Sequence, residues 1–91
     1  MAKWLYPEAV QRAQQACIDF LAQRIDIAQA QAALHQSEQE VVALEEKWLR
    51  TLLFEAENLL EEIRFTVPDD GQFRACAVVA QRVLHALQAS P

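Results

Sequence analysis

The sequence is poor in residues that break secondary structure, with one glycine and three prolines. A sheet protein needs turn residues every ten or so positions. Pro7 and Pro68 are separated by a long stretch that holds neither glycine nor proline, and only Gly71 and Pro91 follow. This scarcity argues against a β-sheet fold and predicts an all-α protein.

Cysteines and long apolar runs are also scarce. Cys17 and Cys76 stand among apolar neighbours, with no CxxC pair and no spacing typical of a disulfide-rich domain. The apolar residues before Pro7 are too few for a signal peptide, and no apolar run reaches the roughly 18 residues of a membrane-spanning helix. We expect free, buried thiols in a cytoplasmic protein that does not cross a membrane.

Negative charge is concentrated in one segment. The formal net charge is −5, and residues 38–65 account for all of it, with eight glutamates against Lys47, Arg50 and Arg64. Such a segment repels phosphates, and no basic patch with interleaved aromatic residues occurs elsewhere. We therefore expect no nucleic-acid binding, and the lack of a lysine-rich polar face argues against a membrane-surface role.

Three helical segments are predicted, over residues 7–35, 38–65 and 70–88. Pro7 suits the first turn of a helix, where its missing N–H would be unpaired. An apolar stripe follows at spacings of three, four and seven, and it weakens in the alanine- and glutamine-rich stretch after Ile27. The stripe consists of Val10, Ala13, Cys17, Phe20, Leu21, Ile27, Ala28 and Leu34.

Capping boxes mark the predicted starts of the second and third helices. In a capping box, the side chains of the cap residue and of the third helical residue each accept a hydrogen bond from the backbone N–H of the other. Two residue pairs have this spacing, Ser37 with Glu40 and Asp69 with Gln72. Pro68 ends the second helix because it disfavours helical geometry in the preceding residue. The apolar positions of the second helix cover about half of its circumference, so this helix is expected to pack on two sides.

The predicted fold is an antiparallel hairpin of two long helices with a shorter third helix along it. This three-helix bundle forms a single domain over residues 1–91 and is completed by dimerisation. At 1.5 Å per residue, the long helices would each span roughly 42 Å. Residues 35–37 contain neither glycine nor proline, so the alternative is one helix of about 60 residues that buries its face only in an oligomer. The Ser37 capping box favours the hairpin.

No residue has a motif context for catalysis or metal binding. Neither His35 nor His85 follows a glutamate at the Glu-x-x-His spacing of di-iron bundles. Cys17 and Cys76 could join the two histidines in a zinc site, but both lie on apolar stripes, where small buried thiols pack well. We therefore predict a non-enzymatic protein with no catalytic residue, no metal and no cofactor.

The second helix carries the predicted contact surface. Phe54 falls among charged residues on the helical wheel, so it is exposed unless a partner covers it. We predict a protein–protein interaction module, a small acidic adaptor, chaperone or inhibitor, that self-associates or docks on a partner helix. The predicted contact residues are Trp48, Leu49, Leu53, Phe54 and Leu60. The alternative is a bundle that binds a small molecule or metal through Glu45 and Glu55 near the core.

Overall fold

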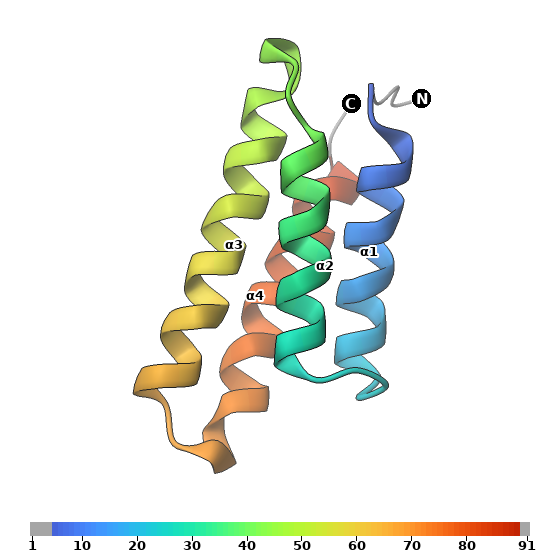
Figure 1. Cartoon of the computed structure of the whole chain (residues 1–91). Helices are drawn as coiled ribbons and strands as arrows, with labels where there is room; N and C mark the ends of the chain where they lie inside the picture. The colour runs from blue at the N-terminus through green and yellow to red at the C-terminus, as the bar shows by residue number, and fades with distance from the viewer. Residues whose placement is uncertain (1–4, 90–91) are drawn as a thin grey trace.

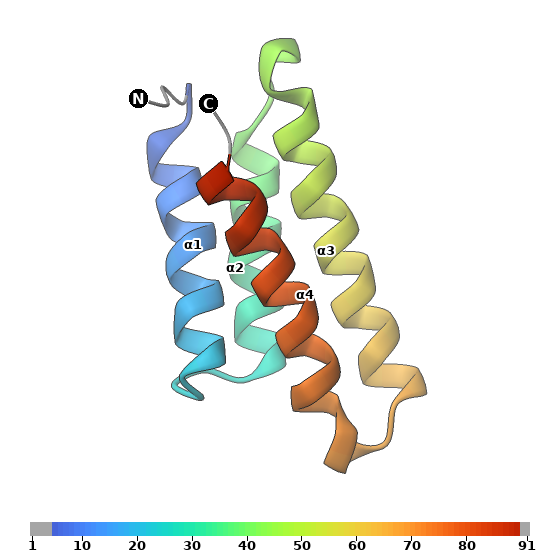
Figure 2. The same cartoon turned by 180° about the vertical axis from the view of Figure 1, so that it is seen from behind.

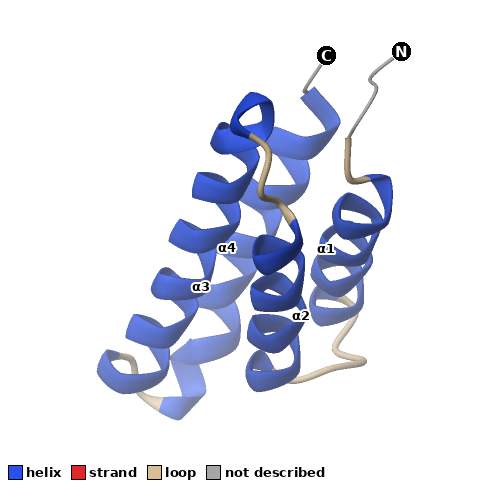
Figure 3. Cartoon of the chain, turned by 45° about the horizontal axis from the view of Figure 1, so that its top comes forward, coloured by secondary structure: helices blue, strands red, loops and turns tan. Residues whose placement is uncertain are grey.

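The computed structural model describes residues 5–89, which contain only helices and loops (Figure 3). A short 3₁₀-helix, η1 (Leu44–Glu46), precedes the third of four α-helices. The all-α prediction is confirmed, whereas the three-helix prediction is wrong. The helices are α1 (Pro7–Leu21), α2 (Ile27–Glu40), α3 (Lys47–Thr66) and α4 (Asp69–Ala89).

The four helices form a closed ring in which consecutive helices run in opposite directions (Figure 1). Helix α2 packs between α1 and α3, and α4 closes the ring by contacting both α3 and α1 (Figure 2). The molecule measures 38 × 21 × 18 Å. Among the described helices, none combines the length and apolar character that crossing a membrane requires.

The core is built from one apolar stripe on each helix. The α1 stripe predicted from the sequence is buried over Val10, Ala13, Cys17 and Phe20. Alanines also contribute to the core, since Ala9 and Ala16 on α1 and Ala30 on α2 are buried. The largest fully buried side chains of the described residues are Leu34, Leu49, Leu53, Val41, Val83, Cys76 and Ser37.

The first predicted helix, residues 7–35, is broken in two because α1 ends in a Schellman motif. Gln23 adopts the left-handed conformation with φ of 62°. Its N–H donates to the carbonyl of Phe20 at 2.9 Å, and the N–H of Arg24 donates to the carbonyl of Asp19 at 2.8 Å. Glycine usually occupies this position, so a glutamine there gives no sequence signal that the helix stops.

Helix α2 begins with a capping box at Asp26 and Gln29. Asp26 Oδ1 accepts from the N–H of Gln29 at 2.8 Å, and Gln29 Oε1 accepts from the N–H of Asp26 at 2.9 Å. The capping box predicted at Ser37 and Glu40 is wrong, since both residues lie in the last turns of α2. The chain leaves α2 later, at Val41, whose extended backbone starts the connection to η1.

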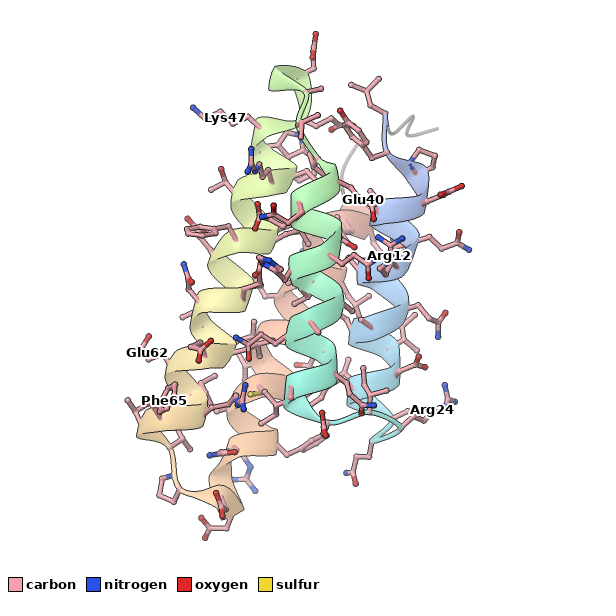
Figure 4. The ribbon with its side chains drawn as sticks, viewed as in Figure 1. Arg12, Arg24, Glu40, Lys47, Glu62 and Phe65 are labelled. Carbon is pink, nitrogen blue, oxygen red and sulfur yellow. The ribbon has the colours of Figure 1, made fainter. Side chains whose placement is uncertain are left out.

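Side-chain contacts fix the end of α2 against the start of α1. Arg12 of α1 and Glu40 of α2 point toward each other and form an ion pair (Figure 4). The hydroxyl oxygen of Tyr6 accepts from the N–H of Ala43 at 3.1 Å. The N-terminus of α1 therefore supports the connection between α2 and α3.

The observed cap at Asp26 and the predicted cap at Ser37 can be distinguished by mutation. Asp26→Ala removes an acceptor for the first turn of α2, so we expect a loss of about 1 kcal/mol of unfolding free energy. Ser37 is fully buried and its hydroxyl has no hydrogen-bond partner, so Ser37→Ala should leave stability unchanged or slightly increased. Chemical denaturation of both variants measures this, and a larger loss for Ser37→Ala would contradict the observed helix start.

Candidate functional site

The predicted contact residues divide between the core and the surface. Leu49, Leu53 and Leu60 are buried within the single chain. Trp48 and Phe54 are exposed, by 43% and 53% respectively. The three leucines are therefore used to fold the chain, and only the two aromatic residues remain accessible to a partner.

The carboxylates predicted to lie near the core, Glu45 and Glu55, are both exposed. The structure buries three other glutamates instead, Glu38, Glu46 and Glu57. Glu46 accepts a hydrogen bond from the N–H of Leu5 at 2.9 Å. The other two lie together between α2 and α3.

His35, Glu38 and Glu57 form a cluster at the α2–α3 interface. His35 and Glu38 are three residues apart on α2, which places them on one side of that helix. Glu57 projects from the facing helix α3, and its Oε1 lies 2.7 Å from His35 Nδ1. Glu38 Oε1 lies 3.8 Å from the same nitrogen. Two carboxylates and an imidazole therefore converge at one point.

Glu38 is held as a carboxylate by its polar neighbours. Arg50 Nε donates to Glu38 Oε2 at 3.0 Å, and Gln39 Nε2 donates to both carboxylate oxygens at 3.3 Å. Burial acts to raise the pKa of Glu38, but these hydrogen bonds and the charge of Arg50 outweigh it. The pKa of Glu38 is therefore lowered from its ordinary value.

The surroundings of Glu57 shift its pKa in the direction opposite to that of Glu38. Burial raises its pKa, and the hydrogen bond and charge of His35 oppose that rise. The charge of Glu38 and a carboxyl–carboxylate hydrogen bond to Glu38 add to the rise. Glu57 is only 8% exposed, and its Oε2 is buried without a hydrogen-bond partner. The net result is a raised pKa, and one carboxylate oxygen is left free to accept a further ligand.

A surface groove of about 670 Å³ opens beside the cluster. Besides the three cluster residues, it is lined by the apolar side chains of Val42 and Phe54. Lys47 and Arg50 line it as well. The groove gives solvent and small solutes access to the cluster.

The outer face of α3 carries a second group of accessible residues. Phe65 is 80% exposed, and it lies three helical turns from Phe54 on the same side of the helix. Lys47, Glu62 and Phe65 project from α3 on the side away from α2 (Figure 4). We call this surface, formed by Lys47, Phe54, Glu62 and Phe65, the α3 outer face.

The cysteines lie apart from the site. Cys17 and Cys76 are both free and buried. Burial raises the pKa of Cys17 to about 12 and also raises the pKa of Cys76. Among the described residues, the group positioned to hold a metal ion contains His35 but neither cysteine nor His85.

The cluster was not predicted from the sequence, because a helix break was expected at His35 to Ser37, where α2 in fact continues. A glutamate follows His35 at the i, i+3 spacing. That spacing is informative only if both residues lie on one helix, as they do in α2.

No protein-family model matches the chain, and comparisons with curated proteins and solved structures found no significant match.

Proposed function

We propose that this chain is a non-enzymatic interaction protein that forms a homodimer through the α3 outer face. The observation that supports this most directly is the exposure of two phenylalanines on one side of one helix. Phe54 and Phe65 are 53% and 80% exposed. Aromatic side chains aligned in this way offer a large apolar area at small entropic cost, which is typical of interface centres.

The charges along α3 favour a second copy of the chain as the partner. Lys47 lies at the N-terminal end of the helix, whereas Glu61 and Glu62 lie towards its C-terminal end. Two copies of α3 packed in opposite directions would place Lys47 of one copy near these glutamates of the other. A twofold axis close to Phe54 produces this arrangement twice, as expected for a symmetric dimer.

The oligomeric state across a range of protein concentrations tests the proposal. Light scattering coupled to size exclusion should give the dimer mass for the unmodified chain at micromolar concentrations. Phe54→Ser should raise the dissociation constant by about tenfold or more, since central interface residues contribute upwards of about 1.4 kcal/mol. Phe65 lies about 16 Å from Phe54 along α3, so Phe65→Ser should weaken the dimer by a smaller factor.

Charge reversal identifies the orientation of the two copies. Lys47→Glu alone should weaken the dimer, and adding Glu62→Lys should restore part of the affinity, because the pair then attracts with reversed signs. Val78→Ser is the matched control, since Val78 is also 53% exposed but lies on α4. A monomer at every concentration, or equal effects of Val78→Ser and Phe54→Ser, would contradict the proposal.

A further inference from the structure

We propose that His35, Glu38 and Glu57 form a binding site for Zn²⁺. One ligand atom from each residue lies within 4.8 Å of the others. They come from two different helices, so the site requires the folded bundle. An imidazole nitrogen with two carboxylates is a ligand set that suits Zn²⁺, whereas Mg²⁺ prefers oxygen ligands alone.

An unused ligand atom on Glu57 is independent support for the site. Its Oε2 is buried and accepts no hydrogen bond, and Glu57 is only 8% exposed. Buried carboxylate oxygens are normally satisfied by a donor or by a cation. A cation shared with His35 and Glu38 would satisfy this oxygen if Glu57 bound it through Oε2.

Two of the three distances between ligand atoms depend on the position of the His35 side chain. Ligand atoms that surround Zn²⁺ tetrahedrally at about 2.0–2.2 Å are roughly 3.3–3.6 Å apart. The distances from His35 Nδ1 are 3.8 Å to Glu38 Oε1 and 2.7 Å to Glu57 Oε1. The His35 side chain is 59% exposed, so its ring can shift outward and admit the ion from the groove.

Arg50 and Gln39 support the site from outside it. They bind the Glu38 carboxylate, mainly at Oε2 for Arg50, and so fix its orientation while Oε1 faces His35. Hydrogen bonds of this kind orient metal ligands in many proteins. With three protein ligands, the fourth position would be open to the groove and taken by water.

Calorimetric titration of the metal-free protein with ZnCl₂ tests the site. We expect one Zn²⁺ per chain, and no comparable binding of Mg²⁺. His35→Ala and Glu57→Gln should each weaken binding by more than the roughly 10–100-fold that follows loss of an outer-sphere partner. His85→Ala is the matched control, because His85 is an exposed histidine on α4, and it should bind as the unmodified chain does.

Two further measurements keep the test independent of folding and of dimer formation. Circular dichroism should show that both ligand variants retain helicity, since His35 is exposed and glutamine is isosteric with Glu57. Phe65→Ser should weaken the dimer and still bind Zn²⁺. Absent binding, unchanged binding in both ligand variants, or equal affinity for Mg²⁺ would each overturn the zinc site while leaving the dimer proposal untouched.

Discussion

Leu53→Asp is expected to abolish the cooperative folded state at room temperature. Leu53 is fully buried in the core, where α3 contacts α2 and α4. The substitution removes the apolar packing of the leucine and places a carboxylate where no basic partner is buried. The combined loss of about 5 kcal/mol or more is comparable to the total stability of a small domain.

The adjacent residue provides the control for this variant. Phe54 is 53% exposed, so Phe54→Asp should change the unfolding free energy of the monomer by less than about 1 kcal/mol at protein concentrations too low for dimer formation. Helical circular dichroism during thermal unfolding distinguishes the two variants. A folded Leu53→Asp with an unchanged melting temperature would show that α3 does not bury Leu53 as described. The pair thus separates the core side of α3 from its outer face.

Glu57→Gln should stabilise the protein at neutral pH by about 1 kcal/mol. The pKa of Glu57 is raised in the folded state. As the pH rises above the ordinary pKa of glutamate, Glu57 therefore ionises more readily in the unfolded chain than in the folded one, and this favours unfolding. Glutamine keeps an oxygen beside His35 Nδ1 and removes the buried charge. The advantage should shrink as the pH falls below the ordinary pKa range of glutamate, because Glu57 is then protonated in both states.

Glu38→Gln should have the opposite effect. The pKa of Glu38 is lowered in the folded state, so its carboxylate contributes stability above its ordinary pKa, and this contribution is lost as the pH falls through the folded pKa. We expect a loss of about 1–2 kcal/mol at neutral pH, since the bond to Arg50 is charge-assisted but Arg50 is half-exposed. The difference from the unmodified chain should vanish in acid.

Urea denaturation from pH 3 to pH 8 measures both effects. As the pH rises, the unfolding free energy of Glu57→Gln should become higher than that of the unmodified chain, and that of Glu38→Gln should become lower. Loss of stability in both variants at neutral pH would mean that Glu57 is ionised and well paired in the fold, contrary to its unpartnered Oε2.

Much of the second half of the fold could be predicted from the sequence. Val67 and Pro68 separate α3 from α4, which span Lys47–Thr66 and Asp69–Ala89. The wide apolar arc predicted for the second helix is explained by its contacts with both α2 and α4. Strong periodicity and a proline are local signals, and no tertiary contact contradicts them here.

The first half could not be predicted because its signals are ambiguous. Gln23 ends α1 in a conformation that glycine normally adopts, so the break has no characteristic residue. Asp26 and Gln29 have the same capping spacing as Asp69 and Gln72, but they lie within a continuous helical pattern. Ser37 and Glu40 have a capping spacing too, yet tertiary packing buries Ser37 inside α2.

The error at residue 37 also hid the candidate metal site. A break there separates His35 from Glu38, so their shared helical side could not be recognised. Glu57 carries no local signal of burial, since it lies between glutamates that are exposed, at positions 55 and 61. Its position depends on how α2 packs against α3, which only the complete fold determines.

The contact between α1 and α4 makes unfolding of the four helices cooperative. Because each helix needs both of its ring neighbours to cover its apolar stripe, neither the α1–α2 half nor the α3–α4 half encloses a core by itself. Detaching one helix therefore uncovers the apolar stripes of both of its ring neighbours. Such interdependence favours all-or-none melting, in which local damage lowers the stability of every helix at once.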